Sequence, residues 1–342
     1  MKKIITLIIG LIISGGAMYF LLRGDIETLR GEFSGGRYAY LIPAAVLWTL
    51  ALVTRGFRWR VLLGSRTSTL HAFNIMNVGY MLNSMPLRVG ELARAWMTTR
   101  LNPSIAFLTS LSTIVVERVL DLLAVLVMLG FALILLPVPS EVSATGVFLG
   151  IITLTMAVFM VYFAHRRDIP HRILKIITRH IAILERLNLE KWLDHFLDGL
   201  EPLTSTRVQR EAILWTVLSW VLSTVTAYIF MLVFFEKGDM PAMMLTIVLL
   251  ALAVAIPSVP GNLGTFEAAG VAGLYFAGVI ASAEAPENAP AVAFALLLHV
   301  FTLAGYVLLG MIGLWMEQTS LSQVREGMSH VQEESTLQTS TG

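Results

Sequence analysis

Long apolar segments alternate with short polar ones along most of this chain of 342 residues. A helix needs about 20 apolar residues to cross a hydrocarbon core about 30 Å thick. Six segments approach or exceed that length: Ile4 to Leu22, Tyr38 to Thr54, Ser104 to Leu136, Thr145 to Ala164, Ala212 to Phe235 and Pro290 to Met316. The pattern therefore predicts an all-α polytopic membrane protein with about six full transmembrane helices.

Two further apolar regions, residues 71–99 and 241–281, are interrupted near their middle. The interrupting residues are Pro86 in the first region and Pro257, Pro260, Gly261 and Gly264 in the second. Each region is long enough for two half-helices, and Pro or Gly ends a helix at such points. Non-helical backbone inside a membrane must be buried in protein or face water. We therefore predict two re-entrant helical hairpins that turn within the membrane.

The two interrupted regions share a motif. Ser84-Met-Pro-Leu-Arg-Val-Gly90 and Ser258-Val-Pro-Gly-Asn-Leu-Gly264 both read Ser, apolar, Pro, two further residues, apolar, Gly. A span precedes each region and a long span follows each. Because Lys and Arg concentrate in cytoplasmic loops, the first hairpin is expected to enter from the cytoplasm and the second from outside. This is an inverted-topology repeat, from which many secondary transporters are built.

The repeat divides the chain into five predicted parts. Residues 1–37 hold the first transmembrane helix and an external loop, 38–136 the first half with hairpin 71–99, 137–211 a linking transmembrane helix and a cytoplasmic amphipathic segment, 212–316 the second half with hairpin 241–281, and 317–342 a disordered cytoplasmic tail. The same charge rule places both termini in the cytoplasm of a multi-pass protein of the cell (inner) membrane.

The polar segment from His165 to Arg210 has apolar residues at helical spacing with basic residues between them. Basic amphipathic helices of this kind lie in the headgroup plane of a membrane. A connector that shields the ends of a helix bundle would show the same spacing, so both interpretations stand.

Composition excludes several kinds of chemistry. The chain has no cysteine, so disulfides, thiolate nucleophiles and cysteine-ligated metals are not available to it. It also lacks the G-x-x-x-x-G-K-[ST] pattern of a P-loop, so ATP is not the expected energy source. We predict no cofactor, no bound metal and no nucleic-acid partner.

Charged residues gather beside the first interruption and in the span that follows it. A helix running from Leu87 would place Arg88 and Glu91 on one face, with Arg94 at its edge. Each charge near the bilayer centre costs roughly 2.5 to 3.5 kcal/mol, so these groups should face inward, pair and surround a hydrated cavity. The set comprises three arginines and four carboxylates: Arg88, Arg94, Arg118, Glu91, Glu117, Asp121 and Glu267.

Two roles for this charged set are open. The charges could bind a substrate, or they could form interior ion pairs that hold helices in register. We expect Arg88 of the first hairpin to pair with Glu117 of the following span. His299 stands alone in an apolar span and is expected to be a hydrogen-bonded core residue.

Four segments resemble, in order, the signatures of the lysylphosphatidylglycerol synthase transmembrane-region family, also called flippase-like domain proteins: "RGFRWRVLL", "NSMPLRVGELAR", "VERVLDLL" and "PSVPGNLGTFE". The resemblance runs from about Trp48 to Trp315. It implies lipid translocation, because in this family the domain is the flipping half of enzymes that aminoacylate phosphatidylglycerol. The family commonly has a second glycine where Asn262 stands, so the turn here departs from the family pattern.

We therefore predict a flippase-like protein, not an enzyme, that moves an anionic or zwitterionic lipid headgroup across the membrane. Arg88 and Arg94 would contact phosphate, since a guanidinium matches it bidentately. The expected partners are a membrane phospholipid or a polyprenyl-phosphate-linked lipid, with lipid biosynthetic enzymes beside them. The predicted substrate-binding residues are Asn83, Arg88, Glu91, Arg94, Glu117, Arg118, Asp121, Asn262 and Glu267.

Two alternatives come from other classes of function. One is a membrane-embedded transferase that uses a lipid-phosphate donor, with an acid such as Glu91 or Asp121 as general base. The other is a non-transporting partner of a lipid biosynthetic complex.

Overall fold

The computed structural model describes residues 16, 26–85, 88–136, 140–180, 189–255, 260–284 and 287–329, and all regular secondary structure among them is helical. Five helical segments in this part are long and apolar enough to cross a membrane. They correspond to α3 (Leu41–Leu62, preceded by the 3-10 turn Tyr38–Tyr40), α6 (Phe107–Leu135), α7 (Ser140–His165), α11 (Thr206–Phe234) and α14 (Ala289–Met316). The predicted class, an all-α polytopic membrane protein, is confirmed, while the predicted span from Ile4 to Leu22 lies outside the described residues.

Two of these helices are longer than their apolar runs. Helix α3 continues to Leu62, past the predicted end at Thr54, and α11 begins at Thr206, before Ala212. Hydropathy marks where a helix is apolar, but a helix continues wherever its backbone bonds and side-chain partners allow. Arg58 illustrates this, because it is fully buried inside α3, where we had expected a loop.

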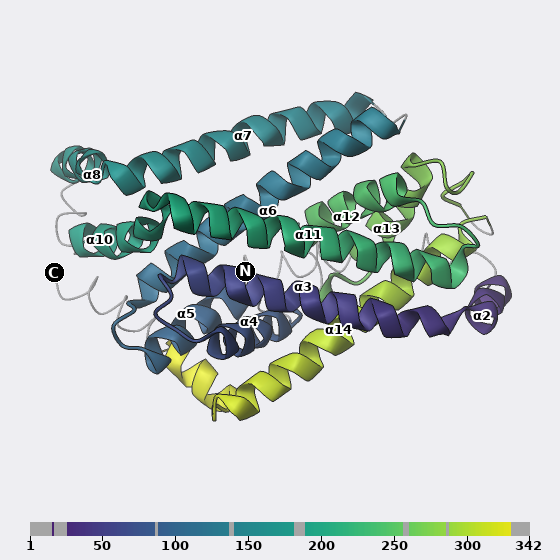
Figure 1. Ribbon diagram of the computed structural model, residues 1–342, viewed down its shortest axis with the longest axis horizontal. Helices are drawn as coiled ribbons and strands as arrows, with labels where there is room; N and C mark the ends of the chain where they lie inside the picture. Colours follow the sequence, from purple (N-terminus) through teal and green to yellow (C-terminus); the bar gives the residue numbers. More distant parts are fainter. Residues whose placement is uncertain are drawn as a thin grey trace.

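Each interrupted region forms two short helices that pack against each other. The first pair is α4 (Thr69–Asn83) and α5 (Gly90–Leu101), and the second is α12 (Met240–Ala255) and α13 (Thr265–Phe276). The breaks fall where the sequence predicts them. The two pairs lie in opposite halves of the bundle along its long axis (Figure 1).

The order and packing of helices α3 to α6 repeat in α11 to α14. Within each set the second helix packs on the third and the third on the fourth. The second helix of each set also packs on the fourth helix of the other set, because α4 contacts α14 and α12 contacts α6. Helices α3 and α11 lie side by side and antiparallel, since Arg37 N donates to Val233 O at 3.0 Å near one end and Arg58 to Thr216 at 3.2 Å near the other.

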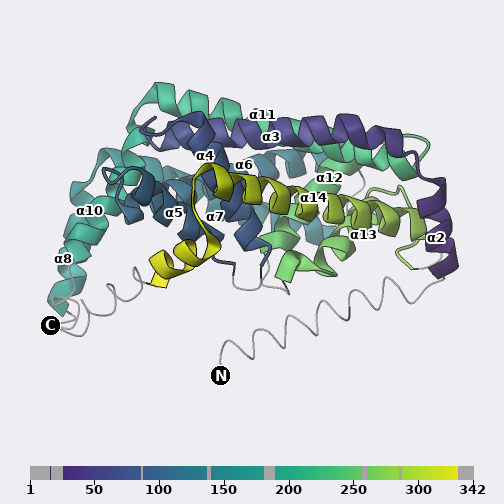
Figure 2. The ribbon, with the colours of Figure 1, turned by 90° about the horizontal axis from the view of Figure 1, so that it is seen from below.

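The amphipathic segment forms α8 (Asp168–His180) and α10 (Leu189–Leu200), followed by the turn Glu201–Thr204. Figure 2 shows both helices at the end of the bundle opposite α2 (Ile26–Gly35). Helix α10 packs on α6, where Thr109 Oγ1 donates to His195 O at 2.9 Å. No residue of α8 is buried, and Ile173, Ile176 and Ile177 are exposed.

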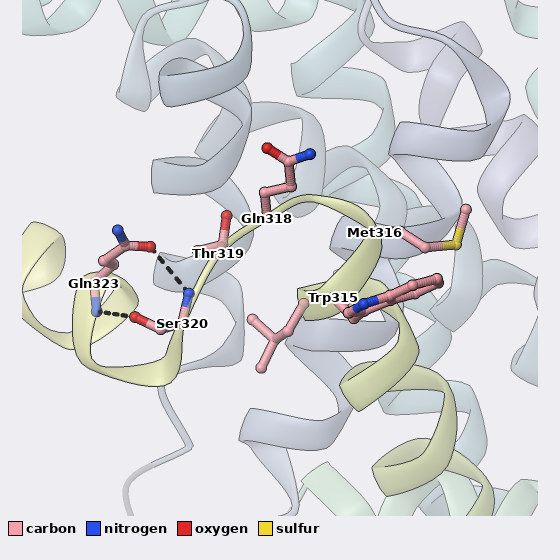
Figure 3. Close-up of a pocket in the computed structure, with 7 residues that line it drawn as sticks. Trp315, Met316, Gln318, Thr319, Ser320 and Gln323 are labelled. Atoms are coloured by element: carbon pink, nitrogen blue, oxygen red, sulfur yellow. Dashed lines mark hydrogen bonds between the residues drawn. The ribbon is translucent and has the colours of Figure 1, made fainter.

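Residues 321–329, which we expected to belong to a disordered tail, form a helix. Its start is capped reciprocally (Figure 3), because Gln323 N donates to Ser320 Oγ at 3.2 Å and Ser320 N donates to Gln323 Oε1 at 3.0 Å. Val324 is buried in the core that α3, α4 and α5 share. The tail is polar in overall composition, so its hydropathy did not reveal this short helix. Residues 330–342 lie outside the described residues.

Candidate functional site

Two buried arginines hold one buried glutamate between α3, α5 and α6. Arg58 Nη2 donates to Glu117 Oε1 at 2.9 Å, and Arg94 Nη2 donates to Glu117 Oε2 at 2.7 Å. The side chains of these three residues are at most 1% exposed. Removing one member of such a group leaves an uncompensated buried charge, so the three residues fix the relative positions of their helices.

The local sequence makes room for Arg94. A Cβ atom at Gly79 of α4 would lie 2.5 Å from Arg94 Cδ, so only glycine allows this approach. The guanidinium of Arg94 lies over the ring of Trp59, 4.2 Å from its centroid. Trp59 is itself held by a 3.2 Å hydrogen bond from Nε1 to Thr113 Oγ1. Arg94 is therefore surrounded by groups that hold it in place.

The network continues from the buried core to an exposed part. Arg58 also donates to Asp121 Oδ1 at 2.6 Å, and Trp220 Nε1 of α11 donates to the same oxygen at 3.0 Å. Arg118 donates to Glu91 Oε1 at 3.0 Å and approaches Asp121 Oδ2 at 3.8 Å. The side chains of Arg118 and Glu91 are 44% and 33% exposed, so the network reaches the surface at this pair.

Arg55 and Arg58 also belong to this region. They were not among the predicted site residues, because they follow the predicted end of a span at Thr54. Arg55 lies over Trp220, 5.7 Å from the ring centroid, and donates to Ser223 at 3.4 Å. Two features of the sequence point to Arg55 and Arg58 as further members of the network. The predicted charged set had one carboxylate too many, and Arg55 and Arg58 are three residues apart, which places them on neighbouring faces of a helix.

The first hairpin turns around Asn83. Its Nδ2 donates to Glu91 Oε1 at 2.9 Å, and its Oδ1 accepts from Gly90 N at 2.8 Å. A Cβ atom at Gly90 would lie 2.0 Å from Gly79 O, so α4 and α5 approach too closely for any side chain there. Asn83 thus joins the end of α4 to the start of α5 and positions the carboxylate that holds Arg118.

The turns of the two hairpins contact each other. Arg88 Nη2 donates to Asn262 Oδ1, and Arg88 Nη1 donates to Val254 O at 3.3 Å. Both residues have left-handed backbone, with φ of 45° at Arg88 and 59° at Asn262. Asparagine adopts this conformation more readily than most residues, which suits it to this turn.

The second turn is held by Glu267 and His299. Glu267 Oε2 accepts from Gly264 N at 2.7 Å and caps the start of α13. Its other oxygen, Oε1, lies 2.7 Å from His299 Nδ1, and His299 Nε2 lies 2.6 Å from Gly261 O. His299 is thus buried and hydrogen-bonded, as expected of a core residue.

The structure brings most of the predicted site residues together, in three groups. Asn83, Glu91, Arg94, Glu117, Arg118 and Asp121 belong to one network, Arg88 and Asn262 form the contact between the turns, and Glu267 lies with His299. The predicted pair of Arg88 with Glu117 is wrong. Both carboxylate oxygens of Glu117 are taken by Arg58 and Arg94, which the helix packing places closer.

The described residues also contain a surface pocket that lies apart from the charged network. Among the described residues, no group of three His, Asp or Glu side chains is placed to hold a metal ion. A surface pocket at the end of α14 contains none of the ion-paired residues (Figure 3). Its lining residues are Leu314, Trp315, Met316, Gln318, Thr319, Ser320 and Gln323. The charged network is therefore the candidate site.

Comparison with known proteins gives one result. The family model described as the lysylphosphatidylglycerol synthase transmembrane region matches residues 7–310. No curated protein and no solved structure matches the chain. The match covers most of the sequence, including every helix from α2 to α13 and all residues of the charged network. This multi-pass membrane protein belongs to the lysylphosphatidylglycerol synthase transmembrane-region family.

Proposed function

We propose that this protein moves a phosphate-bearing lipid headgroup across the membrane, between two halves of inverted topology. The observation that carries the proposal is the exposure of Arg118. This arginine lies eleven residues into the 29-residue apolar helix α6, yet its side chain is 44% exposed. Arginine facing hydrocarbon at that position would cost roughly 2.5 to 3.5 kcal/mol or more, so the proposal places this side chain against water or an anionic ligand.

The network around Arg118 suits an anion site. Glu91 and Asp121 lie within 4 Å of the guanidinium, and both carboxylates are less exposed than the arginine. A guanidinium has five donors in a planar fork, so atoms of Arg118 remain to pair bidentately with phosphate. Arg88, in the neighbouring turn, would bind a second phosphate oxygen or the headgroup beside it.

The proposal assigns different roles to the charged residues. Arg118 and Arg88 contact the headgroup, and Asn83, Glu91 and Asp121 position them. Arg94 was predicted to contact the phosphate. Its side chain is 1% exposed, pairs with Glu117 and lies over the ring of Trp59. Its role here is therefore to hold α5 against α6. Glu117 and Arg58 serve the same purpose.

The arrangement of the two hairpins supports a transport role. They lie in opposite halves of the bundle (Figure 1), and Arg88 of one turn donates to Asn262 of the other. In an inverted repeat, rocking of one half against the other opens a central site to either side in turn. The proposal includes a cell-membrane location with both termini cytoplasmic, and a phospholipid or a polyprenyl-phosphate-linked lipid as substrate.

Lipid movement in vesicles tests the proposal. Purified protein is reconstituted into liposomes, and transfer of headgroup-labelled anionic, zwitterionic and cationic phospholipids between leaflets is followed. Arg118→Lys keeps the charge but loses the fork, so transfer should fall by about tenfold while thermal stability in detergent stays near normal. Arg207→Lys, at an exposed ion pair with Glu211, is the matched control and should transfer normally.

Two results would contradict this function. Normal transfer by Arg118→Lys would remove the arginine from headgroup recognition. A stable wild-type protein that moves none of the lipid classes would favour a transferase or a non-transporting partner of a biosynthetic complex.

A further inference from the structure

The contact between His299 and Glu267 requires a proton. His299 Nε2 lies 2.6 Å from Gly261 O, and because a carbonyl oxygen only accepts, Nε2 must carry hydrogen. In a neutral imidazole, Nδ1 is then an acceptor. It faces Glu267 Oε1 at 2.7 Å, and an ionised carboxylate is also only an acceptor. This contact is therefore a hydrogen bond only when one proton is present, on His299 Nδ1 or on Glu267.

Changing the histidine tautomer cannot replace that proton. Hydrogen on Nδ1 would satisfy Glu267 but would leave Nε2 facing the carbonyl of Gly261 as a second acceptor. Loss of the proton therefore breaks one of the two contacts in either tautomer. It would also leave a net negative charge among apolar groups, since His299 and Glu267 are 4% and 1% exposed and Phe266 stacks on the imidazole at 4.3 Å.

The proton is tied to the shape of the second turn. Gly261, whose carbonyl accepts from His299, and Gly264, whose N–H is capped by Glu267, flank Asn262. Asn262 in turn accepts from Arg88 of the first hairpin. Breaking either contact of the pair frees one side of this turn, which carries Asn262, the residue that contacts Arg88.

The described helices that pack around this pair carry titratable groups at the following positions. Helix α12, which packs on α13, carries no ionisable side chain, and α13 carries Tyr275 in addition to Glu267. On the helices that pack against α14, the ionisable residues are Tyr80 and His71 of α4, Tyr228, Arg207, Arg210 and Glu211 of α11, and Glu27, Arg30 and Glu32 of α2. Tyr306, in α14 itself, packs on Tyr80, and His71 pairs with Glu317. The turn that this pair holds is contacted by one charged side chain among the described residues, Arg88, which donates to Asn262.

We infer that Glu267 and His299 form a proton-binding site whose occupancy controls the contact between the two hairpins, and that the proton is the ion coupled to lipid movement. The second half of this inference rests on the proposed function. In the protonated state the pair is neutral overall and the turn is held. In the deprotonated state one of the two contacts is lost, and the turn is free to move. The proton leaves to the water on the side to which the site is then open.

The variant Glu267→Gln removes the titration but keeps the geometry. A glutamine amide can donate to His299 Nδ1 from nitrogen and accept from Gly264 N with oxygen, as the protonated glutamic acid does. The matched control is Glu211→Gln, which makes the same substitution at an exposed carboxylate on α11.

Thermal stability tests the proton site without any transport assay. Both contacts of the folded pair hold only when it carries one proton, so removal of that proton at high pH should destabilise the folded protein. Wild type and Glu211→Gln should therefore lose thermal stability as the pH is raised. Glu267→Gln should lose measurably less, and an identical loss in Glu267→Gln and wild type would overturn the proton site.

Lipid transfer tests the coupling. With one proton per lipid, a pH difference of one unit across the vesicle supports up to about tenfold asymmetry of labelled lipid between leaflets. Wild type and Glu211→Gln should show this response and lose it when a protonophore is added, while Glu267→Gln should show none. A wild-type protein that moves lipid but ignores the gradient would overturn the coupling, even if Glu267→Gln does not fold. A wild type that moves no lipid contradicts the proposed function and leaves the stability test to decide the proton site.

Discussion

Arg88 and Asn262 are 174 residues apart, occupy the same position in two Ser-x-Pro-x-x-x-Gly segments, and contact each other through their side chains. Both also have positive φ. Equivalent residues of two repeats can touch only where they lie close to the axis that relates the repeats. This contact therefore marks the place where the two hairpins meet.

Substitutions at Asn262 should separate backbone strain from the side-chain contact. Asn262→Gly and Asn262→Ala both remove the acceptor for Arg88, but only alanine also meets the cost of left-handed backbone. We expect the alanine variant to be less stable than the glycine variant by about 0.5 to 1 kcal/mol, measured by unfolding in detergent. Equal stability would mean that the turn relaxes to negative φ.

The ion pair of Arg94 with Glu117 should be strongly coupled. Glu117→Ala leaves Arg58 and Arg94 buried without their carboxylate, and we expect a loss on the order of 3 to 5 kcal/mol. The double variant Glu117→Ala with Arg94→Ala should lose less than the sum of the two single variants, because no unpaired Arg94 then remains. Purely additive losses in thermal or denaturant unfolding would show that the two side chains are not partners.

Gly90, the first residue of α5, and Gly130, inside α6, should respond in opposite ways to alanine. At Gly90 the new Cβ would lie 2.0 Å from Gly79 O, so Gly90→Ala must separate α4 from α5 and should cost several kcal/mol or prevent folding. At Gly130 of α6 no atom lies within 4 Å, and Gly130→Ala should be neutral or stabilising by up to about 1 kcal/mol. Size-exclusion profiles and thermal unfolding compare the two directly. A well-folded Gly90→Ala protein would show that the hairpin is looser than described.

Cysteine labelling tests the membrane orientation, because the chain has no cysteine of its own. Single cysteines at Ser65 and Ser205 should react from the cytoplasm, and those at Ser34 and Ser282 from outside. Ser65 follows the end of α3 and Ser205 precedes α11, and these antiparallel helices place both at one end of the bundle. Labelling of Ser205 from outside would reverse the orientation and the sidedness of both hairpins.

The sequence alone determined the long apolar helices and the two breaks between short ones. These features depend on residues close together in the chain, because hydropathy adds along a segment and Pro or Gly acts on its own turn. The shared motif around Arg88 and Asn262 was visible for the same reason. A helix that continues through charged residues was not visible, and α3 was therefore predicted to end before Arg58.

Only the tertiary structure decided which charges meet. Arg88 and Arg94 are six residues apart and looked equivalent in sequence, yet one reaches the opposite hairpin and the other is buried against Glu117 and Trp59. Ion pairing depends on distances of a few ångströms between side chains from different helices, and helix packing sets those distances. The proton between His299 and Glu267 has the same origin, because it follows from two acceptors that residues 32 positions apart bring together in the folded protein.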